Sequence, residues 1–273
     1  MSKTVLMCRA TFFDVREIKN PHMGRPIDRQ KAHQQWQDLR RALENSGLKV
    51  ELIDPVKDLE DMVFAANPMF VGQARNGEPF VVPSHMRYPS RQQEVRFYVD
   101  WFRARGYRVI DLALGEDYLE GHGDLLWHPD HSRIWAAYGL RSTRGGVDKF
   151  SVAMSPMGFP VTALKLIDEY CYHLDTCLCP LNNDAALIYP GAFSPPSLLS
   201  IRSGFSRVHE ISRAEAVQFM GNGIVVNGRY LTPRLNENLS KILAQEGLSP
   251  IVVETSEFEK SGGSVFCMKA FLD

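Results

Sequence analysis

Residues 260–272 read KSGGSVFCMKAFL, in which two glycines lead into a short apolar run that carries a single thiol. Gly262 and Gly263 have no side chains, so the backbone just before the sulfur can approach a ligand closely. The thiol of Cys267 is therefore a candidate nucleophile. The alternative is a buried structural residue, because free cysteines are among the most buried side chains in proteins.

Composition limits the kinds of partner. A chain of 273 residues can bury a sizeable core, in one large domain or two small ones. A formal net charge of −1 argues against a nucleic-acid or membrane-surface partner, since both need a concentrated basic face. No stretch reads as a signal peptide or is long enough to span a bilayer. We therefore expect a small-molecule ligand.

The cysteines indicate a reducing compartment. There are five of them at irregular spacings, which favours reduced thiols in the cytosol over a disulfide framework. Cys177 and Cys179 are too few ligands for zinc, and alternation along a strand explains their spacing better. We expect a cytoplasmic protein without a metal or another cofactor, and the sequence leaves homo-oligomerisation open.

The chain repeats a unit of hairpin, helix and strand four times. Polar turns such as Asn76-Gly77 and Asn227-Gly228 mark hairpins, and apolar spacing marks the helices and strands. The hairpins are expected over 63–85, 124–139, 172–190 and 223–233. The helices are expected over 90–106, 145–157, 196–204 and 237–247, and the strands after them over 107–114, 160–168, 205–211 and 250–255.

The N-terminal segment contains most of a fifth unit. A strand over 4–10, a polar loop over 14–29, a helix over 30–46 and a strand over 49–54 lack only one hairpin strand. The run SVFCMKAF, residues 264–271, supplies that strand from the far end of the chain. Five equivalent units then close into a ring without exposed sheet edges, and 1–273 forms a single domain. The alternative is an ordinary mixed α/β sheet whose regular spacing is accidental.

Unusual polar residues recur near the first strand of different hairpins, namely Asn67, Asp124, His173, Asp175 and Cys267. In a ring, equivalent positions of the units face a common axis. These side chains would then converge on one small cavity that holds a thiol, an imidazole and carboxylates, which is typical of a catalytic site.

The residue types indicate attack by sulfur on a planar cation. A histidine can activate a thiol and later a water, and His173 begins a hairpin next to an acid. Asp124 and Asp175 would hold a guanidinium, because its nitrogens match carboxylate oxygens in paired hydrogen bonds. The alternatives are a structural histidine and aspartates that cap turns.

Three motifs resemble those of the guanidino-group modifying enzymes: arginine deiminases, dimethylarginine dimethylaminohydrolases and amidinotransferases. They are EGHGD (120–124), HLDT (173–176) and SGGSVFCM (261–268), and the resemblance covers nearly the whole chain. It implies a five-bladed, pseudosymmetric α/β propeller, or pentein. It also implies that Cys267 is the nucleophile, His173 the general acid and base, and Glu120 the acid that orients the histidine or grips the substrate.

The same resemblance nominates arginines that bind a substrate carboxylate. PSRQQE (89–94) indicates Arg91, and RSTR (141–144) indicates Arg144 as its partner, with Arg141 as the less favoured choice. Without the resemblance, we would assign these arginines to a solvated helix start and a loop.

Three departures from the family pattern bear on the substrate. EGHGD has one residue more than the usual acid-Gly-Gly-Asp spacing, which leaves open whether Glu120 or Asp124 takes the place of the acid. HLDT resembles the arginine deiminases and favours unmethylated arginine. FAANP has Asn67 where deiminases have aspartate, and so resembles the arginine dihydrolases. Their INPxM loop also resembles IKNPHM, which nominates Asn20 as a substrate contact.

The expected function is that of a metal-independent arginine dihydrolase, which converts arginine to ornithine, ammonia and carbon dioxide through an amidino-thioether on Cys267. Alternatives of the same class are an arginine deiminase and a dimethylarginine dimethylaminohydrolase, which give citrulline. An amidinotransferase and a non-catalytic, arginine-binding propeller are alternatives of other classes.

Overall fold

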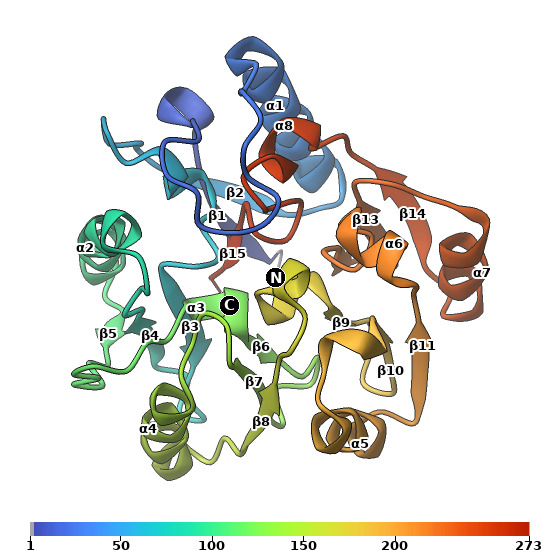
Figure 1. Cartoon of the computed structure of the whole chain (residues 1–273). Helices are drawn as coiled ribbons and strands as arrows, with labels where there is room; N and C mark the ends of the chain where they lie inside the picture. Colours follow the sequence, from blue (N-terminus) through green and yellow to red (C-terminus); the bar gives the residue numbers. More distant parts are fainter. Residues whose placement is uncertain (1–2, 273) are drawn as a thin grey trace.

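A computed structural model describes residues 3–272, which form a ring of five blades around a central axis (Figure 1). Each blade is a three-stranded sheet, and the five sheets together contain strands β1 to β15 of these residues. In every blade the first two strands pair antiparallel and the third pairs parallel to the second. The expected five-bladed α/β propeller is therefore confirmed.

The three strands of each blade follow the predicted order. They are β15 (Ala270–Phe271), β1 (Thr4–Cys8) and β2 (Lys49–Ile53); β3 (Met69–Gln73), β4 (Pro79–Pro83) and β5 (Arg108–Val109); β6 (Leu125–Trp127), β7 (Ile134–Tyr138) and β8 (Val161–Lys165); β9 (Leu178–Pro180), β10 (Ala185–Ile188) and β11 (Arg207–Glu210); and β12 (Ile224–Val226), β13 (Arg229–Thr232) and β14 (Ser249–Val252).

One long helix connects the second and third strands of each blade and lies at the periphery of the ring (Figure 1). These helices are α1 (Arg29–Asn45), α2 (Pro89–Arg103), α4 (Arg144–Met154), α5 (Pro195–Gly204) and α7 (Glu237–Gln245). Short helices and 3-10 turns join consecutive blades: η2 (Glu60–Val63), α3 (Gly121–Asp124), η4 (Glu169–Cys171), η5 (Leu174–Thr176), α6 (Arg213–Val217) and α8 (Ser256–Glu259). Three further 3-10 turns flank the long helices within blades: η1 (Ala10–Phe12), η3 (Ser155–Met157) and η6 (Pro190–Ala192).

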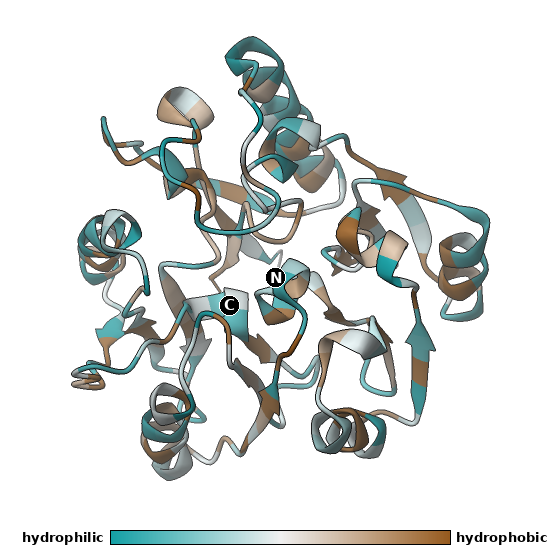
Figure 2. Ribbon diagram, in the orientation of Figure 1, coloured by the Kyte–Doolittle hydropathy of each residue, from teal (hydrophilic) through white to brown (hydrophobic). Residues whose placement is uncertain are grey.

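Local sequence explains how a blade forms. Helix α1 packs one apolar side inward, because its buried residues recur at helical spacing: Ala32, Trp36, Leu39 and Leu43. Figure 2 shows peripheral helices that mix hydrophilic and hydrophobic residues, whereas hydrophobic residues are frequent in the strands nearer the centre of the ring. At the tip of the β12–β13 hairpin, Asn227 and Gly228 have φ angles of 48° and 73°, as a two-residue hairpin turn requires.

The two ends of the described chain close the ring. Leu6 of β1 pairs with Ala270 of β15, and the Leu272 amide donates a hydrogen bond of 3.0 Å to the Thr4 carbonyl. The C-terminal strand therefore completes the N-terminal blade, as predicted. None of the helices in residues 3–272 combines the length and apolar character needed to cross a membrane.

Two of the predicted strands are reduced to two residues each. Only Ala270–Phe271 of residues 264–271 is a strand, because the Phe266 amide bonds to the Asn222 carbonyl at 3.2 Å instead of to a neighbouring strand. Only Arg108–Val109 of residues 107–114 is a strand: the Ile110 amide still bonds to the Val81 carbonyl at 2.9 Å, and Ala113 further on adopts a left-handed φ of 48°. The segment around Cys267 is consequently a loop fixed by contacts with other blades.

Candidate active site

A buried polar residue precedes the first strand of every blade. Asn67 precedes β3, Asp124 precedes β6, Asp175 precedes β9 and Cys267 precedes β15, so all four lie near the first strands of different blades, as predicted. In the remaining blade the fully buried Asn222 precedes β12 and adds to the predicted set. Its equivalent place in the repeat is the sequence signal that could have identified it.

Cys267 is held between two of these residues. Its thiol donates a hydrogen bond of 3.0 Å from Sγ to Oδ2 of Asp175, and Nδ2 of Asn222 donates to the sulfur at 3.3 Å. The Cys267 carbonyl accepts a hydrogen bond of 3.0 Å from the Ala66 amide, so the backbone is fixed as well. Burial raises the pKa of the Cys267 thiol well above its ordinary value, and the charge of Asp175 adds to this rise. A cation placed beside the sulfur would oppose both effects.

Asp175 is suited to hold such a cation. Its Oδ1 is buried and has no hydrogen-bond partner within residues 3–272, whereas its Oδ2 binds the thiol. Burial raises the pKa of Asp175 to about 7. A guanidinium that donates to Oδ1 would satisfy this oxygen and stabilise the carboxylate next to the reacting sulfur.

His173 is oriented by Glu120. Nε2 of His173 lies 2.8 Å from Oε2 of Glu120, which also accepts a hydrogen bond of 2.7 Å from Nη1 of Arg141. The Arg87 amide donates to the other carboxylate oxygen at 2.9 Å. Burial alone would raise the pKa of Glu120, but Arg141 and His173 lower it to about 2. Glu120 is thus an ionised acid in contact with the histidine, as the resemblance implies.

Asp124 does not have the predicted substrate-binding position. Its Oδ2 accepts hydrogen bonds from the hydroxyl (2.6 Å) and the amide (3.2 Å) of Ser142, and its Oδ1 accepts one from the Leu174 amide (3.2 Å). Both oxygens are therefore used to fix the backbone on either side of the site. Because Leu174 follows His173, Asp124 positions the histidine, and Glu120, not Asp124, contacts it.

The extra residue in EGHGD brings Gly123 into a crowded position. A Cβ atom on Gly123 would lie 2.4 Å from Nδ2 of Asn67 and 3.2 Å from the ring of His173. Only glycine fits between the two side chains without displacing them. The motif thereby places Asn67 and His173 on either side of one glycine backbone.

Asn67 and Arg91 face the same cavity as Cys267. Nη1 of Arg91 donates a hydrogen bond of 3.0 Å to Oδ1 of Asn67, and Nη2 donates one of 3.1 Å to Oε2 of Glu94. Nδ2 of Asn67 is buried and makes no hydrogen bond within residues 3–272. The orientation of Asn67 therefore leaves an amide donor for a ligand. Arg91 is buried in the cavity, so the alternative of a solvated arginine at a helix start is wrong.

The structure corrects the choice between the two arginines of RSTR. Arg144 is the first residue of α4, and its side chain is exposed and paired at 2.8 Å with Asp148. Arg141 is 4% exposed and lines the cavity. Because Thr143 caps α4 and accepts a hydrogen bond from the Gly146 amide, the helix begins with Arg144 on its outer side. The prediction that Arg144 lies in the site beside Arg91 is therefore wrong, because its side chain is on the surface.

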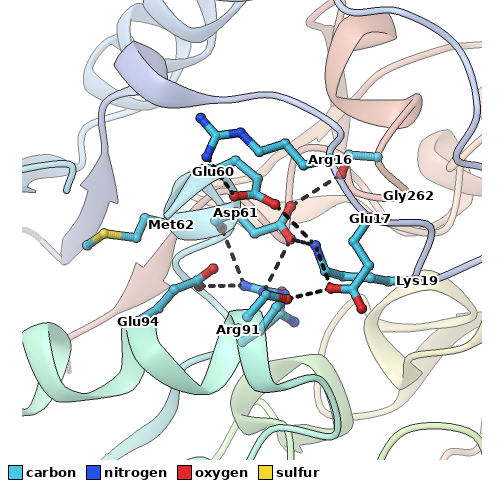
Figure 3. A network of polar contacts seen from close by, with 12 residues as sticks. Arg16, Glu17, Lys19, Glu60, Asp61, Met62, Arg91, Glu94 and Gly262 are labelled. Carbon is cyan, nitrogen blue, oxygen red and sulfur yellow. Dashed lines mark hydrogen bonds and ion pairs between the residues drawn. The ribbon is translucent and has the colours of Figure 1, made fainter. Parts of the chain in front are cut away.

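The loop over 14–28 contributes Asn20, Lys19 and Met23 to the cavity lining. Nδ2 of Asn20 donates a hydrogen bond of 3.0 Å to the Ser261 carbonyl, which joins the loop to the nucleophile segment. Figure 3 shows Lys19 beside Asp61, with Arg91 close to the same carboxylate. Lys19 and Asp61 were outside the predicted set, although Lys19 adjoins Asn20 in the IKNPHM motif.

The chain is similar to several known proteins. The family model described as N,N dimethylarginine dimethylhydrolase, eukaryotic, matches residues 17–272. The bifunctional arginine dihydrolase/ornithine cyclodeaminase AgrE of Nostoc sp. is 34% identical to this chain over 268 residues. This match covers 96% of the chain but only 37% of AgrE. The N(G),N(G)-dimethylarginine dimethylaminohydrolase of Mycobacterium tuberculosis is 32% identical over 263 residues, with 96% of this chain and 83% of that protein covered.

A solved structure agrees closely over the whole chain. The N-terminal domain of ArgZ, a cyanobacterial arginine dihydrolase bound to its product, has a TM-score of 0.93 and 31% identity, with 100% of this chain and 98% of that chain covered. Relatives with these names hydrolyse carbon–nitrogen bonds in linear amidines. The chain therefore belongs to the N,N-dimethylarginine dimethylhydrolase family, within the guanidino-group modifying enzymes, and is a guanidino-hydrolysing enzyme.

Proposed function

We propose that this chain hydrolyses the guanidino group of L-arginine twice and releases ornithine, two molecules of ammonia and carbon dioxide. The observation that carries the proposal is Asn67, which presents an unpaired amide donor and no carboxylate to the cavity of Cys267. Similarity to proteins named arginine dihydrolase supports it.

The guanidinium would bind between Cys267 and Asp175. A donor nitrogen of the guanidinium satisfies Oδ1 of Asp175, and the positive charge lowers the pKa of the adjacent thiol. Arg91 and Arg141 line the same cavity, and each has a buried Nε that makes no hydrogen bond within the described residues. These two guanidinium groups match the α-carboxylate of an amino acid.

The first half of the reaction forms and hydrolyses a covalent intermediate. The Cys267 thiolate attacks the guanidinium carbon, and the carbon–nitrogen bond to a terminal nitrogen breaks. That nitrogen takes a proton from His173 and leaves as ammonia. His173, oriented by Glu120, then takes a proton from a water molecule, which attacks the amidino-thioether and restores the thiol. The product of this half is citrulline.

The second half depends on retention of citrulline. Its ureido group is neutral, and the Nδ2 donor of Asn67 can bind the ureido oxygen, which a carboxylate cannot do. A second attack by the Cys267 thiolate expels ammonia, which takes a proton from His173, and hydrolysis of the resulting S-thiocarbamate leaves a carbamate that loses carbon dioxide to give ornithine. The two halves together consume two water molecules.

The test is incubation of the purified chain with arginine, with ammonia counted and the amino acid product identified by chromatography. Two ammonia molecules per arginine and ornithine are expected, and Cys267→Ser should be inactive but still bind arginine. One ammonia and citrulline would replace the proposal by the deiminase alternative. Dimethylamine release from dimethylarginine in preference to arginine turnover would favour the dimethylaminohydrolase alternative, and amine-dependent loss of arginine would reveal a transferase.

A further inference from the structure

Lys19 places a buried ammonium group in the active-site cavity. Its side chain is 1% exposed, and Nζ lies 2.9 Å from Oδ2 of Asp61, 3.4 Å from Oε1 of Glu60 and 3.7 Å from Oε2 of Glu17 (Figure 3). A buried ammonium is costly unless it is paired, so these carboxylates hold the group where it is. Lys19 also lies on the loop over 14–28, which Asn20 joins to the nucleophile segment.

Asp61 is an acid that lines the same cavity as Cys267. Among the described residues that line this cavity, Asp61 is the one acid, and Lys19, Arg91 and Arg141 are the cations. Oδ1 of Asp61 accepts a hydrogen bond of 3.3 Å from the Ser261 hydroxyl, and Oδ2 binds Lys19. An α-ammonium that enters with its guanidinium at Cys267 therefore meets an acid that already binds an ammonium.

We propose that Lys19 and the α-ammonium of the substrate compete for Asp61, so that Lys19 determines specificity for the α-ammonium. The inference rests on the proposed function and names a second determinant for the same substrate. Two ammonium groups at one carboxylate oxygen repel each other, and the weaker binding of both raises the dissociation constant of α-amino substrates. Guanidino acids that lack the α-ammonium can bind Arg91 and Arg141 while Lys19 stays on Asp61.

The surroundings of Lys19 make the exchange feasible. When a substrate ammonium binds Asp61, the Lys19 ammonium can remain paired with Glu60 and Glu17, which already lie within 3.7 Å of Nζ. Glu60 is 8% exposed and Glu17 is 47% exposed at the side chain, so the second acceptor leads toward solvent. Lys19 is thus a competitor that moves a short distance rather than a fixed block.

The test compares two ligands that differ only in the α-ammonium. Arginine and 5-guanidinopentanoate are titrated calorimetrically into the Cys267→Ser chain, which prevents turnover. Lys19→Met removes the charge but keeps the chain length, and Lys19→Gln removes the charge but keeps a donor for Asp61. Lys19→Arg retains the charge. Lys149→Met removes a lysine that pairs with Asp117 away from the cavity and is the matched control.

Lys19→Met and Lys19→Gln should tighten arginine relative to 5-guanidinopentanoate by about tenfold. Lys19→Arg and Lys149→Met should leave this ratio unchanged. An unchanged ratio in Lys19→Gln, or weaker arginine binding with 5-guanidinopentanoate unaffected, would overturn the inference about Lys19 alone. If neither ligand binds the Cys267→Ser chain and arginine is not turned over by the unmodified chain, the proposed function fails and the inference fails with it.

Discussion

Asn67 is the residue on which the number of hydrolysis steps depends. Asn67→Asp would place a negative charge next to Arg91 and opposite the ligand, which favours a cationic guanidinium over a neutral ureido group. We expect the variant to release mainly citrulline and one ammonia per arginine. The measurement is the ratio of ornithine to citrulline at saturating arginine. If the variant loses stability but keeps ornithine as its product, Asn67 only holds the turn before β3.

Mutations should distinguish the cavity arginines Arg91 and Arg141 from the surface arginine Arg144 by their effect on arginine binding. Arg91→Ala removes a buried guanidinium of the proposed carboxylate site and should weaken arginine binding by about 1.5 to 3 kcal/mol, the range for hydrogen bonds to charged groups. Agmatine, which has no carboxylate, should lose much less. Arg141→Ala should also lower kcat, because Arg141 shares Glu120 with His173.

Arg144→Ala is the matched control for these variants. Its ion pair with Asp148 is on the surface, where such pairs contribute about 0 to 1 kcal/mol. We expect kinetic constants near those of the unmodified chain. A large, arginine-specific loss in Arg144→Ala would mean that the side chain enters the site.

Asp175 should make stability fall as pH rises. Its ordinary pKa of 3.8 is raised by burial to about 7 in the folded chain, so between these values the folded state keeps a proton that the unfolded state has lost. The stabilisation is complete below pH 3.8 and is lost as pH rises through about 7. Asp175→Asn does not titrate, so its stability relative to the unmodified chain should improve by up to about 4 kcal/mol from pH 4 to pH 8. Urea unfolding at several pH values measures this difference, and a constant difference would contradict it.

At the residue scale, the sequence predicts what its motifs contain and misses what depends on side-chain direction. Glu120 and His173 lie in short motifs and meet as the resemblance implies, and the Cys267 thiol meets Asp175 of the HLDT motif. Arg141 and Arg144 are three residues apart. Arg141 lies just before α4 and Arg144 is its first residue, and only this helix start determines which of the two points inward. Lys19 and Asp61 are 42 residues apart, and nothing in either segment indicates that they meet.

At the element scale, the loops before the hairpins are more important for the site than the strands themselves. Asn222 joins its own loop to two others: its Nδ2 donates to the Asp175 carbonyl at 2.9 Å and to the Cys267 sulfur at 3.3 Å, and its Oδ1 accepts from the Phe266 amide at 3.1 Å. These contacts explain why the predicted strand over 264–271 is mostly loop. The repeat predicts the blades, but contacts between loops of different blades leave no periodic signal.

Asn222→Asp tests this junction. The variant keeps an acceptor for the Phe266 amide but loses the donor to Cys267 and puts a second carboxyl near Asp175. Each buried group left without its partner costs about 1 to 3 kcal/mol. We expect a loss of stability in that range and a kcat decrease larger than the change in KM, because the nucleophile is displaced while Arg91 and Arg141 are untouched. Unfolding in urea and steady-state kinetics give the two quantities, and an unchanged kcat would remove Asn222 from any role in positioning the thiol.

At the scale of the whole molecule, the ring was predictable because its signals are local and repeated. Polar turns such as Asn227-Gly228, apolar hairpin strands and amphipathic helices each appear in one unit and recur in the next. The closure of the ring was predicted by counting strands: the N-terminal unit lacked one hairpin strand, and the strand expected over 264–271 belonged to no other unit. The closed ring brings residues as far apart as Lys19 and Ser261 to one cavity.

Because the two ends of the described chain meet in one blade, we expect activity to require a complete ring but not chain ends at this particular place. Thr4 and Leu272 are joined by a backbone hydrogen bond of 3.0 Å, so a short linker can connect the two ends. New ends can be opened at Asn76-Gly77, an exposed hairpin tip where the substitution of a side chain on Gly77 would meet nothing within 4 Å. The length of the linker is not critical, because each doubling of a loop's length costs only about 0.6 kcal/mol of loop-closure free energy. This circular permutant should keep turnover within about tenfold of the unmodified chain.

The contrasting variant ends at Lys269 and lacks β15. It loses the pairing of Leu6 with Ala270 and the hydrogen bond from the Tyr107 hydroxyl to the Leu272 carbonyl, and it exposes the edge of β1. The loop that carries Cys267 then has no strand to anchor it, so we expect loss of activity together with a lower midpoint of thermal unfolding. Activity in the truncated chain, or a folded permutant without activity, would show that the site does not depend on closure of the ring.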